Sequence, residues 1–170
     1  RDGEQVNQPE RLAALAYGSR APEQWGQKAE RVDFYDLKAD LEALLAPRVA
    51  TFRKVNHPAL HPGRAAEVVL DGQVIGVLGE LHPQWVQKYD LPAAPVLFEV
   101  ALDTLLTRAV VKGQPVSRFQ PVRRDLALVM DESVEAGSLL AAFQVLALPG
   151  VTGIGLFDVY RGKGLEEGKK

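Results

Sequence analysis

The chain has 170 residues, 46% of them hydrophobic and 25% charged, which is the composition of an ordinary folded protein with one large domain or two small ones. Its net charge of −2 excludes a strongly basic protein that coats nucleic acid, although a local basic patch can still bind RNA. Without cysteine it can form no disulfide, thiolate zinc site or cysteine nucleophile. No apolar run is long enough to span a bilayer, and the first residues lack the apolar segment of a signal peptide, so we predict a cytoplasmic protein. The chain begins without methionine, and we expect it to be a piece of something longer.

One clear helix is predicted in the first half of the chain. The apolar residues 11–17 form either a strand or a short helix. Asp33 can cap the clear helix, Asp36 adds negative charge to its first turn, and Pro47 ends it. Its apolar stripe is typical of a face that packs on a core and consists of Phe34, Leu37, Leu41, Leu44 and Leu45.

Strands and a hairpin are predicted to follow. Asp71-Gly72 between two apolar runs is a strong hairpin signal, and Gly76 and Gly79 indicate a bulge or a close approach of backbones. Pro83 suits the first position of a short helix. The buried face of that helix is predicted to be Trp85, Val86 and Tyr89. The other predicted elements are a strand over 49–55, a turn segment over 57–64, a strand over 95–102 and a helical turn over 103–108.

A domain boundary is predicted within residues 109–118, where Gly, Pro and Ser separate two structured halves. After it, the apolar residues of Phe119–Met130 predict a strand buried on both faces. Ser133 or Asp131 can cap a helix over 135–146, and a further strand is predicted over 151–161.

The histidines and glycines offer no convincing catalytic or metal site. His57 and His61 have the spacing of a helical metal pair, with Glu80 and His82 as further candidates, but the neighbouring prolines forbid a regular helix. Ordinary turn residues are the favoured interpretation. Serine-hydrolase and phosphate-loop motifs are absent from the sequence, and the carboxylate pairs have no context that would shift a pKa predictably.

The basic residues of the second half are the strongest functional candidates. Arg118, Arg123 and Arg124 lie at the start of the strand that begins with Phe119, and Arg161 and Lys163 lie in the late loop. A rigid strand end can hold a guanidinium at a fixed angle to a phosphate or a base, although solvated surface charge is the simpler interpretation of this stretch alone.

Six motifs, in order, give the chain a family resemblance from about residue 10 to its end. They are V-D-F-Y-D-L-K (32–38), H-P-G-R-A-A (61–66), G-V-L-G-E-L-H-P (76–83), F-E-V-A-L (98–102), F-Q-P-V-R-R-D-L-A-L-V (119–129) and F-D-V-Y-R-G-K-G (157–164). In this order they resemble the beta subunit of bacterial phenylalanyl-tRNA synthetase.

The resemblance implies an α+β chain in two parts. Residues 1–112 resemble part of a class II synthetase-like module, an antiparallel sheet with helices that has lost its chemistry. Residues 113–118 would be the linker, and residues 119–170 the first half of a ferredoxin-like anticodon-binding domain. Phe52-Arg53-Lys54-Val55 is the nearest match to the class II F-R-x-E motif, but Val55 replaces the Glu, so Arg53 is expected to be a solvated strand residue.

The same resemblance implies the function. The alpha subunit would activate phenylalanine with ATP and magnesium in an assembly of two alpha and two beta subunits. This chain would contribute assembly and binding of the anticodon region of tRNA(Phe), with no catalytic centre, metal or cofactor of its own. On this interpretation Arg118, Arg123, Arg124, Arg161 and Lys163 contact RNA, and Phe157 or Tyr160 offers a stacking surface unless Phe157 packs in the core.

Two alternatives and one structural expectation remain open. The chain could be purely a scaffold for the alpha subunit, or a stand-alone ferredoxin-like module that binds a small molecule. A ferredoxin-like domain places its third strand beside its first, and this chain ends before a third strand. We therefore expect its first two strands to lack a hydrogen-bonding neighbour.

Overall fold

The computed structural model of the chain describes residues 8–107, 110–111, 113, 116 and 118–170. The chain divides into two compact units, Arg1–Gly113 and Gln114–Lys170, and each is described by itself. The α+β class is confirmed. Residues 114, 115 and 117 of the predicted linker lie outside the described residues, as does Arg108 of the predicted helical turn.

A five-stranded antiparallel sheet forms the first unit, in the order β1-β5-β4-β3-β2. Its strands are β1 (Arg11–Ala16), β2 (Thr51–Lys54), β3 (Leu60–Leu70), β4 (Gln73–Leu81) and β5 (Val96–Ala101). The ambiguous segment 11–17 is thus a strand, because its backbone pairs with β5. Strand β3 begins inside the segment 57–64 that was predicted to be a turn. A register irregularity between Leu60 and Ala65 accommodates the proline and the glycine there.

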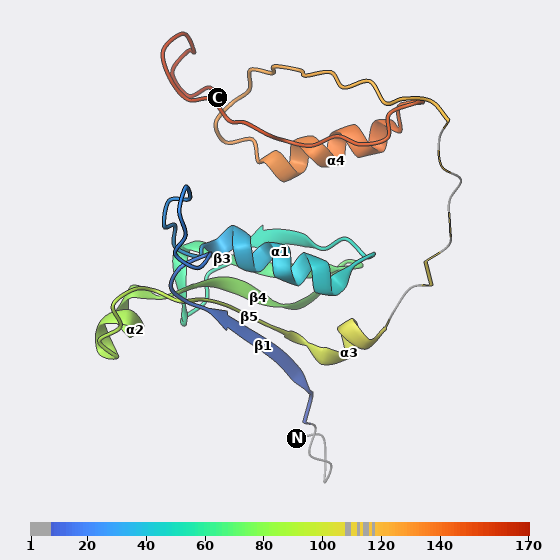
Figure 1. Cartoon of the computed structure of the whole chain (residues 1–170). Helices are drawn as coiled ribbons and strands as arrows, with labels where there is room; N and C mark the ends of the chain where they lie inside the picture. Colours follow the sequence, from blue (N-terminus) through green and yellow to red (C-terminus); the bar gives the residue numbers. More distant parts are fainter. Residues whose placement is uncertain (1–7, 108–109, 112, 114–115, 117) are drawn as a thin grey trace. The chain divides into compact units, whose positions relative to one another are not determined.

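Helix α1 (Phe34–Leu45) lies across one face of the sheet (Figure 1). Its fully buried side chains follow one i, i+4 line: Leu37, Leu41 and Leu45. They pack against buried residues of the sheet that include Val68, Leu70, Ile75, Leu78, Val96, Phe98 and Val100. Leu44 of the predicted stripe is instead 52% exposed, because it lies off that line.

Two local predictions about the hairpin are confirmed. Asp71 and Gly72 both have positive φ, 51° and 81°, as a tight hairpin turn between β3 and β4 requires. A Cβ on Gly76 would lie 2.0 Å from the carbonyl oxygen of Glu99 on β5. Only glycine allows the two strands to approach this closely at that point.

Short helices α2 (Pro83–Lys88) and α3 (Leu102–Leu106) complete the first unit. The predicted buried face of α2 is wrong: Trp85 and Val86 are only half-buried and Tyr89 is 62% exposed. The helix is too short to lay a stripe on the core. Its rings stack on each other instead, 6.3 Å apart, and the indole of Trp85 donates to the carbonyl of Pro58.

In the second unit the only helix of the described residues is α4 (Ala136–Leu146). The predicted caps are wrong: the N-cap position is Glu135, without a side-chain cap. The N–H of Val134 donates to the carbonyl of Asp131, so Ser133 lies in a turn before the helix.

Neither predicted strand of the second unit is hydrogen-bonded as a strand. Residues 119–130 and 151–161 carry no strand ladder, and Figure 1 draws both as coil. Burial on both faces is therefore wrong for the first of them, with Leu126 73% exposed. Extended backbone becomes a strand only beside a hydrogen-bonded partner, and the described residues supply no such partner to either segment.

Candidate nucleic-acid interface

The candidate basic residues lie on or beside the two extended segments 119–130 and 151–161, and the end of the first is hydrogen-bonded to the C-terminal residues 168–170. Met130 and Lys170 exchange backbone hydrogen bonds of 3.1 and 3.0 Å, and the N–H of Glu132 donates to the carbonyl of Gly168 at 2.8 Å. The ammonium of Lys169 also pairs with the carboxylate of Asp131 at 2.7 Å. These contacts anchor the C-terminal end of the segment that carries Arg118, Arg123 and Arg124.

All three arginines of the first segment are exposed. The guanidinium of Arg123 lies 3.6 Å from the carboxylate of Asp125 and 5.8 Å from the centre of the Phe157 ring. Arg124 donates to the carbonyl of Arg123 at 3.1 Å. The cation–π contact of Arg123 brings the two extended segments together at this point.

The two basic residues of the second segment have different surroundings. Arg161 donates to the carboxylate of Glu132 at 2.9 Å, with both side chains more than half exposed. Lys163 is exposed, and its carbonyl accepts a hydrogen bond from the hydroxyl of Tyr160 at 3.1 Å. A surface ion pair of this kind contributes little to stability, so Arg161 can exchange its partner for another anion at small cost.

The two aromatic candidates are accessible. Phe157 is 68% exposed and Tyr160 57% exposed, so in this structure neither ring packs in a core. An exposed ring beside a guanidinium has the geometry on which a nucleobase can stack. The alternative that Phe157 packs in a core is therefore wrong here, because among the described residues no sheet packs around the extended segment that carries it.

The histidines make ordinary local hydrogen bonds, as the favoured interpretation had it, but only His57 lies in a loop: His61 lies in β3 and His82 caps α2. In each of the three His-Pro pairs, Nδ1 of the histidine accepts from the backbone N–H two residues later. The distances are 3.3 Å for His57, 3.0 Å for His61 and 3.1 Å for His82. Within the described part of the chain, no three His, Asp or Glu side chains gather where they could hold a metal ion.

Arg53, the residue nearest to a class II signature, does not fit an ATP site. It lies on the short edge strand β2, 59% exposed, and its Nε pairs with the carboxylate of Glu67 at 2.8 Å. Val55, at the position of the motif's glutamate, offers no carboxylate. The guanidinium of Arg53 is already paired with a carboxylate on the neighbouring strand β3, so it is not positioned to bind a triphosphate.

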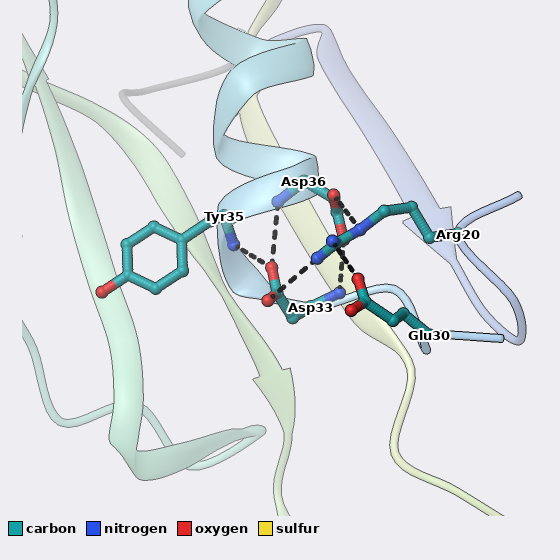
Figure 2. Close-up of polar contacts among 5 residues, drawn as sticks. All are labelled: Arg20, Glu30, Asp33, Tyr35 and Asp36. Atoms are coloured by element: carbon teal, nitrogen blue, oxygen red, sulfur yellow. Dashed lines mark hydrogen bonds and ion pairs between the residues drawn. The ribbon is translucent and has the colours of Figure 1, made fainter. Parts of the chain in front are cut away.

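Sequence reasoning missed an ion-pair cluster at the start of α1, which Figure 2 shows. Asp33 caps the helix by accepting from the N–H groups of Tyr35 at 2.8 Å and Asp36 at 3.2 Å, and the carboxylate of Asp36 accepts from the N–H of Asp33 at 2.8 Å. Arg20 joins both carboxylates and adds Glu30, with contacts of 2.8 to 3.2 Å. Asp33 and Asp36 were visible as capping signals, whereas nothing local pointed to Arg20.

Electrostatics in this cluster follow from these contacts. The hydrogen bond from the backbone N–H of Asp33 has the largest effect and lowers the pKa of Asp36; burial opposes it, and the Arg20 guanidinium lowers the pKa further. The same partnership raises the pKa of Arg20. We call this cluster the brace. It ties the loop after β1 to the start of α1, because Arg20 of that loop contacts the carboxylates of Glu30, Asp33 and Asp36.

Comparisons with known proteins give two matches in tandem. The family model described as "Phenylalanyl tRNA synthetase beta chain CLM domain" matches residues 1–102. The model described as "Ferredoxin-fold anticodon binding domain" matches residues 117–170.

Individual relatives agree along the whole chain. A phenylalanine–tRNA ligase beta subunit of Chromobacterium violaceum is 59% identical over 170 residues, which are 100% of this chain and 22% of that protein. Beta subunits of the same name from Neisseria gonorrhoeae and Dechloromonas aromatica are each 53% identical over 96% of this chain and 21% of theirs. The chain thus spans about a fifth of the length of the curated relatives it matches.

Proposed function

Because the chain belongs to the phenylalanyl-tRNA synthetase beta-chain family, we propose that it is a non-catalytic part of a phenylalanine–tRNA ligase. Its two roles are assembly with the alpha subunit and binding of the anticodon region of tRNA(Phe). The alpha subunit performs the ATP- and magnesium-dependent aminoacylation, in a cytoplasmic assembly of two alpha and two beta subunits. Among the described residues, no helix combines the length and the apolar character that crossing a bilayer needs.

The observation that carries the RNA-binding role is the match of residues 117–170 to an anticodon-binding family. All five candidate basic side chains fall in this stretch: Arg118, Arg123, Arg124, Arg161 and Lys163. Their exposure supports the assignment, because an arginine fork must be accessible to meet a phosphate or a base edge.

The contacts of three of the five side chains give them different weights. Among the described residues Arg124 contacts only a backbone carbonyl, so its guanidinium keeps donors for RNA. Arg123 and Arg161 must share their charge with Asp125 and Glu132. Of these three arginines, Arg124 is therefore the one whose removal should weaken tRNA binding with least effect on the protein itself.

The experiment is a salt titration of tRNA(Phe) binding to the ligase with Arg124→Ala. Loss of one phosphate contact should weaken binding and reduce the slope of log affinity against log salt by about 0.9. Arg64→Ala is the matched control, since Arg64 is 60% exposed and pairs with Glu80 in the first unit. Unchanged affinity and slope for Arg124→Ala would reject its RNA role.

The same measurements separate the alternatives. If the chain is only a scaffold, the alpha subunit should co-purify with it, and substitution of any of the five basic residues should leave the affinity for tRNA unchanged. A stand-alone small-molecule module would bind phenylalanine or a nucleotide in a calorimetric titration and would not retain the alpha subunit.

A further inference from the structure

A surface hollow of about 410 Å³ in the first unit, called the His-Pro hollow below, lies between the loop before β3 and the start of α2. Its polar lining consists of His57, His82, Asn56 and Gln84, and Leu60 and Pro62 supply apolar walls. Small-molecule sites have volumes of about 300–1,000 Å³ and combine apolar walls with a few polar groups, as this hollow does. No Asp, Glu, Lys or Arg side chain of the described residues belongs to the lining, so the hollow offers hydrogen-bonding groups without a carboxylate or an ammonium beside them.

Hydrogen bonds hold the walls of the His-Pro hollow together. The N–H of His82 donates to the carbonyl of Ala59 at 2.9 Å. The carbonyl of Pro58 accepts from the indole of Trp85 at 3.1 Å and from the side-chain amide of Gln84 at 3.3 Å. These contacts tie the loop before β3 to the start of α2, so the hollow is formed before any ligand binds, and little ordering remains to oppose binding.

The two histidines of the lining have a fixed tautomer. Nδ1 of His57 accepts from the N–H of Ala59, and Nδ1 of His82 accepts from the N–H of Gln84. A neutral imidazole that accepts at Nδ1 carries its proton on Nε2, so each ring offers an N–H donor at its far end. Within the described part of the chain neither Nε2 has a hydrogen-bond partner. Because the backbone N–H of Gln84 is already used, the donors that remain for a ligand are side chains.

N–H donors without a carboxylate beside them favour an anionic acceptor, because hydrogen bonds to an ionised oxygen are stronger than those between neutral groups. A metal ion would need the lone pair of Nε2, which the proton occupies, so the same tautomer disfavours a metal. The amides of Asn56 and Gln84 add donors, and a phosphate group has more oxygens to meet them than a carboxylate has. The hollow has room beyond the phosphate itself, and Leu60 and Pro62 can pack against an organic part.

We propose that the His-Pro hollow binds a small molecule that carries a phosphate monoester. The Nε2–H groups of His57 and His82 donate to two phosphate oxygens, the amide of Asn56 donates to a third, and the organic part contacts Leu60 and Pro62. The site lies in the first unit, away from the basic residues of the second, and does not depend on the proposed function.

The test follows the side-chain nitrogen signals of the histidines by NMR while glycerol phosphate is added to the full chain. The Nε2 signals of His57 and His82 should shift with a dissociation constant of about 1 mM or lower, and glycerol without phosphate should shift neither. Inorganic phosphate should bind more weakly, because it lacks the organic part. Equal affinities for the two phosphates would overturn the monoester and assign the hollow to the free anion.

Two substitutions of His57 separate the two nitrogens of its ring. Asn places an acceptor oxygen near the position of Nδ1, so His57→Asn keeps the bond from the N–H of Ala59 and loses the outer donor. It should weaken binding at least about tenfold, as loss of a hydrogen bond to a charged group does. Gln carries an N–H donor near the position of Nε2, so His57→Gln should bind more tightly than His57→Asn. His61→Asn is the matched control, since Nδ1 of His61 makes the same local bond with the N–H of Gly63 outside the lining of the hollow.

Each outcome decides the matter. The proposal is supported when His57→Asn weakens binding, circular dichroism shows that variant folded, and His61→Asn stays within about twofold of the unaltered chain. Absence of any shift with glycerol phosphate overturns it, and so does equal weakening by His61→Asn, because a general effect of losing an imidazole is then responsible. Should His57→Asn fail to fold, Asn56→Ala gives the answer, since Asn56 is exposed and its substitution leaves both Nδ1 bonds in place. Unchanged affinity in Asn56→Ala would then reject the site.

Discussion

Replacing Asp33 by alanine tests the brace at the start of α1. The substitution removes the carboxylate that accepts two hydrogen bonds, from the backbone N–H of Tyr35 at 2.8 Å and from that of Asp36 at 3.2 Å. It also removes one contact with Arg20 at 3.2 Å. Loss of an N-cap costs about 1 kcal/mol, within a range of about 0.5–2. The contact with Arg20 is partly exposed and adds little, so the free energy of unfolding should fall by about 1 kcal/mol.

Tryptophan fluorescence can follow this loss in the intact chain. Both tryptophans, Trp25 and Trp85, lie in the first unit, so their emission reports on that unit alone during urea unfolding. A loss of about 1 kcal/mol corresponds to a fall in Tm of about 4–8 °C for a unit of this size.

The control is Asp40→Ala, on an exposed position of the same helix and away from its cap. It should change the free energy of unfolding by less than about 0.5 kcal/mol. Equal effects of the Asp33 and Asp40 substitutions would refute the capping argument, since the loss would then reflect only the removal of an acidic side chain.

Other predictions address the core, the strand contact, the acid limit and the second unit. Leu41→Ala should cost about 2–5 kcal/mol in urea unfolding, because this side chain is fully buried. Gly76→Ala should be strongly destabilising, whereas Gly63→Ala, whose Cβ would meet atoms only at 3.5 Å, should cost much less; similar losses would contradict the close-approach argument. The lowered pKa of Asp36 gives stability that is present above its ordinary pKa of about 4 and is lost as pH falls through the lowered value. Asp36→Asn should therefore flatten the acid limb of a plot of stability against pH, and an unchanged limb would exclude this role. Residues 119–170 alone should show no cooperative melt by circular dichroism, which a sharp transition would disprove.

Local features of the fold could be read from the sequence because short-range contacts determine them. The cap at Asp33 and the turn at Asp71-Gly72 depend on few neighbours and on intrinsic backbone preferences. The glycine at position 76 indicated a bulge or a close approach, but its partner strand β5 is far away in the chain. The basic residues of the second half were also identified from the sequence, since charge and spacing are visible there. Their RNA contacts remain a prediction for the salt titration to decide.

Errors arose where a residue's environment depends on distant partners. Phe119–Met130 alternates like a buried strand, yet a strand needs a neighbour, and the described residues supply no ladder beside it. Tyr89 has the composition of a buried face, but a helix as short as α2 leaves it exposed.

By itself, then, the sequence determined the family, the α+β class and the capped helix, because these depend on residue types and near spacing. Only the tertiary structure decided the strand order β1-β5-β4-β3-β2 and the recruitment of Arg20 to the helix start. These features join residues far apart in the chain, and the free energy that selects such pairings comes from burying the whole sheet against α1 rather than from any local pattern.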